Sequence, residues 1–326
     1  MDNIVDIRDL HVNFKIYEGI LKVLNGVKFR VGRGEKIGLI GEAGCGKTTT
    51  MLSLMKILPM PPGIIENGEI FLNGKDVLKM NSNELQQMRR STASMIFQDP
   101  TAALNPVFKI GVLIGDVVRF SQLSQGRKVS KEEIRDRTIK VLQEVSMPDP
   151  ERIMQNYPIQ LSGGMRQRIA IAMALVSEPE LLIADEPGTN LDVTIQDQVL
   201  RLLGDLVKKK NTSVVLISHA LGAVKGLVDR VYTMYAGNMI EDALTGDLFS
   251  DPLHPYTQSL FKAVPKLSGG GIPPGIGGRI PNYLNPPTGC RFHPRCPHVK
   301  PICSEKVPPI YNVEGGHNVA CFLYGG

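Results

Sequence analysis

The chain has 326 residues, a formal net charge of +5, and the composition of an ordinary globular protein, with 42% hydrophobic and 21% charged residues. This length is enough for one large domain and a smaller appendage. The charge is mild and mixed in sign along the chain, so it does not by itself indicate nucleic acid or an anionic membrane surface as a partner.

The N-terminal residues and the apolar segments predict a chain without a membrane span. Asp2, Asp6 and Asp9 stand where a signal peptide would need a positive start followed by an apolar run. No stretch approaches the roughly 18 uncharged apolar residues that a transmembrane helix needs. We therefore expect a cytosolic protein that reaches a membrane only through a partner.

Strands and helices are predicted to alternate along most of the chain. Short runs rich in apolar and β-branched residues, typical of strands, lie at 4–14, 27–31, 36–40, 68–74, 93–97, 180–185, 212–218 and 230–237. Helical spacing is expected at 48–58 and through most of about 107–178. This alternation is typical of parallel α/β units.

After about residue 248 the sequence changes in character. Residues 267–278 are rich in Gly and Pro and predict a linker. The tail beyond them is rich in Pro and holds Cys290, Cys296, Cys303 and Cys321, four of the five cysteines. No internal repeat is found.

The stretch GEAGCGKTTT at 41–50 follows an apolar strand and precedes a helical pattern. It fits G-x-x-x-x-G-K-[ST], in which small residues let phosphate oxygens approach backbone N–H groups at a helix N-terminus. Lys47 is expected on the β- and γ-phosphates and Thr48 on Mg²⁺. The predicted nucleotide contacts of this loop are Gly41, Gly44, Gly46, Lys47, Thr48 and Thr49. Cys45 is interpreted as a small residue that fits, rather than as a redox switch.

The run LLIADE at 181–186 supplies two acids at the end of a predicted buried strand. Ligands of open parallel sheets bind at the carboxyl ends of the strands. Asp185 is therefore a candidate ligand of Mg²⁺, and Glu186 is a candidate to polarise the attacking water.

At this point the sequence resembles the ABC-type ATPases. LSGGMRQR at 161–168 looks like their signature motif, and it precedes LLIADEP. Gln98 resembles the glutamine of their Q-loop, and NLDVT at 190–194 resembles their D-loop. His219 resembles their switch histidine. The resemblance implies a RecA-like core, an antiparallel β subdomain and a helical subdomain (about 98–178) within residues 1–247. A Cys-rich extension at 248–326 follows them.

The resemblance also implies a head-to-tail dimer that encloses two ATP molecules. Each ATP would lie between the phosphate loop of one subunit and Ser162, Gly163 and Gly164 of the other. In the family His219 contacts the γ-phosphate, Gln98 contacts Mg²⁺ and water, and Asp192 shapes the dimer contact. Tyr17 is the candidate that stacks on adenine, with Phe14 as the competitor.

Three positions depart from the family pattern. Ala220 follows the histidine where Asp is frequent, and Gly188 and Asn190 replace residues usual in the peptide-transporting subgroup. They leave open whether this site turns over slowly or belongs to an asymmetric pair.

Three further segments resemble the ATPase subunits of dipeptide and oligopeptide importers: FQDPTAALNP at 97–106, DPLHPYTQSL at 251–260, and the cysteine-containing tail. The resemblance implies import of peptides driven by ATP hydrolysis at the cytoplasmic face of the cell membrane. The expected partners are a second ATPase subunit, two transmembrane permease subunits and, indirectly, an extracytoplasmic peptide-binding protein. A heterodimer of ATPase subunits is expected, with a homodimer as the alternative.

The four tail cysteines lack the C-x-x-C pairs of common zinc ribbons. Their thiolates could hold Zn²⁺ or a [4Fe–4S] cluster. Within the resembled subgroup this tail is associated with a [4Fe–4S] cluster, and we expect the cluster rather than zinc, in a structural role.

Two rival functions belong to other classes. One is an ABC-type ATPase that acts on nucleic acid or ribosomes, and the other is an ATPase that senses redox state or iron. The chain has one cassette and no long heptad run, so no nucleic-acid partner is expected.

Overall fold

The structure is a computed structural model that describes residues 2–189, 191–263 and 275–325. Two compact units make up the chain. The first comprises Met1–Ile4, Val31–Lys36 and Lys79–Ser218, and the second comprises Val5–Arg30, Ile37–Leu78 and His219–Gly326. Most of the predicted linker at 267–278, and Asn190 of the D-loop segment, lie outside the described residues.

Three parallel strands form the centre of the first unit. β7 (Leu181–Asp185) pairs with β6 (Ala93–Ile96) on one side and with β8 (Ser213–Ile217) on the other. Every residue of β7 and β8 is buried, as expected for parallel strands covered on both faces. The predicted parallel α/β arrangement is thereby confirmed for these strands.

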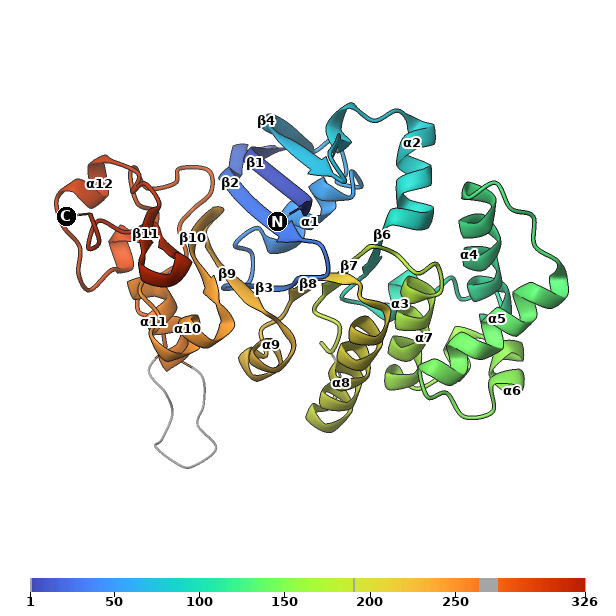
Figure 1. Cartoon of the computed structure of the whole chain (residues 1–326). Coiled ribbons are helices and arrows are strands. Elements are labelled where there is room, and N and C mark those ends of the chain that lie inside the picture. The colour runs from blue at the N-terminus through green and yellow to red at the C-terminus, as the bar shows by residue number, and fades with distance from the viewer. Residues whose placement is uncertain (1, 190, 264–274, 326) are drawn as a thin grey trace. The chain divides into compact units, whose positions relative to one another are not determined.

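Helices make up most of the rest of this unit. They are α2 (Ser82–Gln87), α3 (Pro100–Ala103), α4 (Ile110–Ser124), α5 (Lys131–Glu144), α6 (Pro150–Gln155), α7 (Gly163–Leu175) and α8 (Val193–Lys210). A π-helical turn (Met88–Thr92) joins α2 to β6, and a 3-10 turn (Pro158–Gln160) precedes α7. Helices α4 to α7 pack on one another in a bundle (Figure 1). The prediction that residues 107–178 are mostly helical is confirmed.

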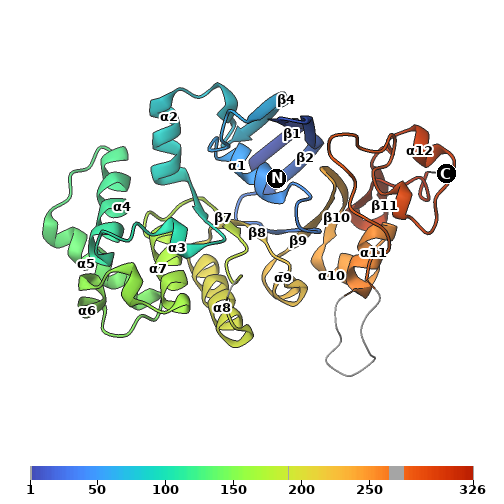
Figure 2. The same cartoon turned by 180° about the vertical axis from the view of Figure 1, so that it is seen from behind.

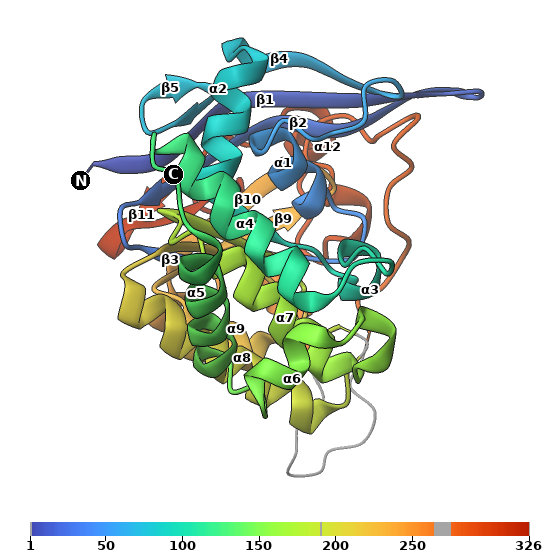
Figure 3. The ribbon, with the colours of Figure 1, turned by 90° about the vertical axis from the view of Figure 1, so that its right-hand side faces the viewer.

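An antiparallel sheet lies in the second unit, with the strand order β2 (Gly19–Gly32), β1 (Asn3–Ile16), β4 (Gly63–Leu72), β5 (Lys75–Asp76) (Figure 3). A 3-10 turn (Val77–Lys79) follows β5. Strands β2 and β4 begin earlier than their apolar runs predict. In β4 the added residues pair with the far end of β1, where Val12 faces Ile65 and Phe14 faces Gly63.

The other strands of this unit form a mixed sheet. β3 (Lys36–Ile40) pairs in parallel with β9 (Arg230–Tyr235), and β10 (Asn238–Leu244) runs antiparallel to β9. The tail then adds β12 (His317–Val319) to β10 and β11 (Tyr311–Val313) to β12. Strands of three residues carry too little pattern to be predicted from sequence, and these two were missed.

Short helices complete the second unit (Figure 2). They are α1 (Lys47–Leu54), α9 (Leu221–Leu227), α10 (Thr245–Ser250), α11 (Pro255–Lys262) and α12 (Ile302–Glu305), with 3-10 turns at His293–Arg295 and Glu314–Gly316. The predicted helix at 48–58 is wrong in its C-terminal part. Lys56 takes a left-handed backbone (φ 49°), and α1 has ended at Leu54. Among the described residues, no helix is long and apolar enough to cross a membrane.

A small aromatic core joins the tail to β9 and α11 within this unit. Tyr235, Tyr256 and Phe292 are each at most 1% exposed, and their ring centroids lie 4.6 to 5.5 Å apart. The tail is therefore packed into the unit through its own aromatic side chain, in addition to the pairing of β12.

Candidate functional site

The phosphate loop (residues 41–48) joins β3 to α1, as predicted. Gly41 and Gly46 both have positive φ, at 148° and 111°. A Cβ on Gly41 would lie 2.2 Å from the Met234 carbonyl oxygen, and one on Gly46 would lie 2.5 Å from a methyl of Leu24. Both the backbone angles and the close neighbours therefore require glycine at these two positions.

The polar side chains of the loop are arranged for an anion. Lys47 is only 5% exposed, and its ammonium donates to the carbonyl oxygens of Gly41 (2.8 Å) and Glu42 (3.0 Å). Thr48 is exposed, and the N-cap residue of α1, Gly46, has no side chain to cap the helix. An uncapped helix N-terminus beside a buried ammonium is a site that phosphate oxygens fit.

The two predicted acids lie at the carboxyl end of β7. Asp185 is the last residue of the strand and is 3% exposed. Glu186 has a left-handed backbone (φ 48°), and its N–H donates to the Ile217 carbonyl oxygen at 2.9 Å. Glu186 Oε2 accepts hydrogen bonds from Gln98 Nε2 and from Thr189 Oγ1, each of 3.0 Å. The structure thus brings Gln98 and Glu186 together, and it adds Thr189, which the sequence analysis missed.

Ser162 begins the signature helix. Its hydroxyl accepts from the Met165 N–H at 3.3 Å and caps α7, whose first residues are Gly163 and Gly164. A Cβ on Gly164 would lie 2.8 Å from a methyl of Ile195, so this glycine lets α7 approach the start of α8. The exposed serine and bare backbone leave this helix end accessible.

Asp192 caps the next helix. Its carboxylate accepts from the Ile195 N–H at 2.9 Å at the start of α8. The structure therefore gives this residue a local role that the sequence analysis did not predict. Its predicted role in a dimer contact stays a prediction.

His219 and Tyr17 lie in the second unit. His219 is exposed and follows β8. Tyr17 is fully exposed at the turn between β1 and β2, whereas Phe14 is half-buried within β1. Of the two aromatic candidates, Tyr17 is the one with an uncovered ring, although its role stays a prediction.

The four tail cysteines line one small cavity, together with His254, His293 and His298. Burial, helped by the other three thiols and opposed by a hydrogen bond from the Phe292 backbone, raises the pKa of Cys290 to about 11. Backbone N–H groups of His298 and Lys300 donate to the sulfurs of Cys296 and Cys303, each at 3.4 Å. Nevertheless, no group of three or more His, Cys, Asp or Glu residues in the described part of the chain is placed to hold a metal ion.

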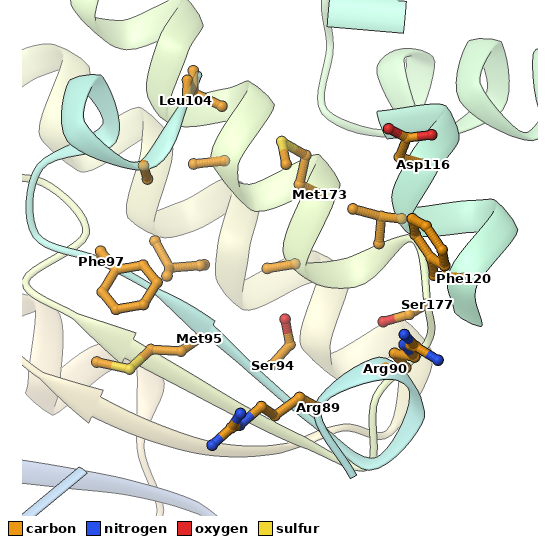
Figure 4. A pocket seen from close by; sticks show the side chains of 15 residues that line it. Arg89, Arg90, Ser94, Met95, Phe97, Leu104, Asp116, Phe120, Met173 and Ser177 are labelled. Carbon is orange, nitrogen blue, oxygen red and sulfur yellow. The ribbon is translucent and has the colours of Figure 1, made fainter. Parts of the chain in front are cut away.

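An apolar groove of about 380 Å³ lies in the first unit beside β6 (Figure 4). Phe97 and Phe120 line it and are 41% and 39% exposed, and Arg90 lies 5.2 Å from the Phe120 ring centroid. Phe97 directly precedes Gln98, so the groove adjoins the residue that contacts Glu186.

Two family models match the sequence. Residues 24–189 match the model described as ABC transporter, and residues 240–303 match the model described as Oligopeptide/dipeptide transporter, C-terminal region.

Curated relatives align along nearly the whole chain. The oligopeptide transport ATP-binding protein OppD of Bacillus subtilis is 42% identical, over 98% of this chain and 88% of that protein. The dipeptide transport ATP-binding protein DppD of the same organism is 41% identical, over 99% and 95%. The OppD of Escherichia coli is 40% identical, over 98% and 93%.

Solved structures share the fold. The dimeric post-hydrolysis state of the ATP-binding cassette MJ0796, bound to ADP and Pi, has a TM-score of 0.66 at 24% identity and covers 74% of this chain and 98% of that one. CbiO1 from Clostridium perfringens, part of an ABC transporter complex, has a TM-score of 0.63 at 25% identity, with coverage of 77% and 92%.

Proposed function

Because the chain belongs to the ABC transporter family, among the ATP-binding proteins of oligopeptide and dipeptide transporters, we propose that it hydrolyses ATP to drive peptide import. The ABC ATPase fold predicted from the sequence is confirmed by the structural likenesses. The observation that carries the proposal is the phosphate loop, in which positive φ angles and close neighbours demand Gly41 and Gly46. The relatives' names concern transport, so neither rival function gains support from them.

The residue roles follow from the chemistry of the side chains and, for His219 and Tyr17, from the family resemblance alone. Gly44, Thr49 and the other loop residues would contact the phosphates, Lys47 would neutralise the β- and γ-phosphates, and Thr48 and Asp185 would be ligands of Mg²⁺. Glu186 orients the attacking water, and its contact with Gln98 supports this role because a donor fixes the carboxylate. His219 contacts the γ-phosphate, and Tyr17 stacks on adenine.

Hydrolysis requires a second subunit. Ser162, Gly163 and Gly164 present a helix N-terminus, which would cap the γ-phosphate of an ATP bound to another chain. Asp192 lies near that dimer contact. The partner is a different ATPase subunit, with a homodimer as the alternative.

The apolar groove is the surface on which a permease subunit would dock. Its exposed Phe97 is adjacent to Gln98, which donates to Glu186. A permease segment bound in the groove would therefore move when the Gln98–Glu186 contact changes. Two permease subunits and an extracytoplasmic peptide-binding protein complete the transporter. The chain then acts as a peripheral protein on the cytoplasmic face of the membrane.

The C-terminal extension (residues 248–326) follows an ATPase domain formed by residues 1–247, with its helical subdomain at about 98–178. Cys290, Cys296, Cys303 and Cys321 would hold a [4Fe–4S] cluster. They line one cavity, and backbone N–H groups donate to the sulfurs of Cys296 and Cys303, as they do to sulfur ligands of such clusters. A single Zn²⁺, held by sulfurs about 2.3 Å from the metal, is the alternative. The cluster, when bound, would cross-link the tail.

The cluster proposal is tested with anaerobically purified protein. A broad absorbance band near 400 nm with about four irons per chain supports it. One zinc per chain and no iron would overturn it. Cys303→Ser should lower the iron content, whereas Cys45→Ser, outside the cavity, should leave it unchanged.

The ATPase proposal is tested with Glu186→Gln. This variant should bind MgATP but turn it over about 10²–10⁴-fold more slowly. Glu151→Gln is the matched control, because Glu151 is exposed and forms an ion pair of 3.0 Å with Arg135 on the helical bundle. Wild-type turnover in Glu186→Gln would show that another residue orients the water. Failure of the wild-type chain to bind MgATP would refute the function itself.

A further inference from the structure

Side chains from the C-terminal extension reach the phosphate loop at Glu42 and at Gly44. Arg295 donates from Nη1 to Glu42 Oε2 (2.8 Å) and from Nη2 to Glu42 Oε1 (3.2 Å). The Tyr283 hydroxyl donates to the Gly44 carbonyl oxygen at 2.8 Å. The Glu42 N–H in turn donates to the Tyr256 hydroxyl at 2.8 Å. The loop is therefore held both through its backbone and through its one acidic side chain.

Arg295 is itself firmly placed. Its side chain is 3% exposed, Nε donates to the Gly277 carbonyl oxygen at 2.8 Å, and Nη1 also donates to the Tyr235 hydroxyl at 3.2 Å. Burial lowers the pKa of Arg295, but the hydrogen bonds to Glu42 and Tyr235 outweigh burial and raise it above its ordinary value. A guanidinium anchored at several atoms fixes the Glu42 carboxylate in a two-point geometry that an ammonium cannot reproduce.

The middle of the loop has little other steric support. Ala43 and Gly44 are exposed, and a Cβ on Gly44 would meet nothing within 4 Å. Gly41 and Gly46, at the ends, are instead confined by close neighbours. Glycine loses more conformational entropy on ordering than any other residue. Hydrogen bonds to Glu42 and Gly44 order the loop before the nucleotide binds, so the entropy lost by the loop on binding is smaller.

We propose that Arg295 and Tyr283 are positioning residues of the phosphate loop, through which the C-terminal extension sets the affinity of the chain for ATP. Neither side chain needs to touch the nucleotide for this effect. The inference rests on the proposed function, since it concerns the loop that is proposed to bind ATP.

The test measures the Kd of MgATP by calorimetry, with the full chain carrying Glu186→Gln so that ATP is not consumed. Tyr283→Phe removes one hydroxyl. Arg295→Lys keeps the positive charge but loses the two-point hydrogen bonding of the guanidinium to Glu42. Each should raise the Kd about 3- to 10-fold, the effect of one lost hydrogen bond that helps to order the site. In chains with Glu186 intact, the KM for ATP should rise by a similar factor while kcat at saturating ATP changes less than twofold.

Tyr324→Phe is the matched control. Its hydroxyl also donates to a backbone carbonyl, that of Leu253, at 2.9 Å, but this contact involves no residue of the loop. The control should leave the Kd of MgATP unchanged, and thermal unfolding of all variants shows whether they are equally folded.

A double-mutant cycle tests the route through Glu42. If Arg295 acts by holding that carboxylate, Glu42→Gln combined with Arg295→Lys should bind MgATP within about twofold of Arg295→Lys alone. Fully additive losses would mean that the two residues act separately and would overturn the proposed route.

The inference and the proposed function fail in different ways. Unchanged Kd values in Tyr283→Phe and Arg295→Lys, with binding lost in Lys47→Ala, would overturn the inference and leave the function standing. An equal loss of MgATP affinity in Tyr324→Phe would show that the higher Kd values come from general destabilisation, and it would also overturn the inference. If Arg295→Lys fails to fold, the Kd of MgATP for Tyr283→Phe alone decides whether the inference holds. Absence of MgATP binding by the wild-type chain would instead refute the function.

Discussion

Gln98 Nε2 donates a hydrogen bond of 3.0 Å to Glu186 Oε2, although the two residues lie 88 positions apart in the sequence. The same oxygen accepts from Thr189 Oγ1, also at 3.0 Å. Two donors on one carboxylate oxygen fix the orientation of the side chain on a residue whose backbone is already left-handed (φ 48°). A fixed carboxylate orientation suits Glu186 to position the attacking water.

Thr189→Val should therefore slow turnover without weakening the binding of ATP. The substitution keeps the shape of the side chain and removes one donor, so we expect kcat to fall about fivefold, the equivalent of one hydrogen bond of about 1 kcal/mol. Steady-state kinetics of the variant assembled with its partner ATPase subunit separate kcat from KM. A raised KM at unchanged kcat would contradict this role.

Gly46→Ala should abolish measurable nucleotide binding. The new Cβ would meet a methyl of Leu24 at 2.5 Å, at a φ of 111° that side chains rarely adopt. Gly246→Ala is the matched control, because a Cβ there meets nothing within 4 Å and the residue lies in α10. Alanine in a helix is preferred by about 1 kcal/mol, so the control should bind MgATP normally and unfold at the same or a higher temperature. Normal binding by Gly46→Ala would show that the loop rearranges.

The phosphate loop could be predicted from sequence because its determinants are consecutive. Gly41 and Gly46 have positive φ angles of their own, and Lys47 donates to the Gly41 carbonyl six residues away, although the contacts that confine the two glycines come from distant segments. Buried β7 and β8 were predicted for a similar reason, since continuous apolar runs suit strands covered on both faces. The early end of α1 was missed because the apolar spacing continues beyond Leu54 while the backbone of Lys56 turns left-handed.

Contacts between distant segments could not be predicted. Arg295 and Glu42 are 253 positions apart, and each alone reads as an ordinary surface charge. Only the fold, which brings Phe292 against Tyr235, places that arginine over the loop. Thr189 was missed because it lies three residues after Glu186, and only the left-handed backbone at Glu186 brings the two side chains into contact.

Asp192→Ala should destabilise the chain, whereas Asp192→Asn should not. The carboxylate caps α8 by accepting from the Ile195 N–H, and asparagine caps a helix about as well as aspartate does. Loss of the cap should cost about 1 kcal/mol in the free energy of unfolding, measured by urea titration. If Asp192→Asn is stable but has lost turnover, the charge of Asp192 also serves the dimer contact. Equal stability of both variants would show that the cap contributes nothing.

Cys45 should resist alkylation in the folded chain at neutral pH. The thiol is 2% exposed, and burial raises its pKa above the ordinary value, although the nearby Lys47 ammonium opposes the rise. Because the thiolate is the nucleophile, a raised pKa lowers the reactive fraction at neutral pH, and the reaction should quicken steadily as pH rises toward that pKa. Peptide mass spectrometry after timed exposure to iodoacetamide should show modification at least about tenfold slower in the folded chain than in urea, where the pKa returns toward 8.5. Equal rates in the two states would mean that the loop opens readily, and would restore the redox-switch interpretation that the sequence analysis set aside.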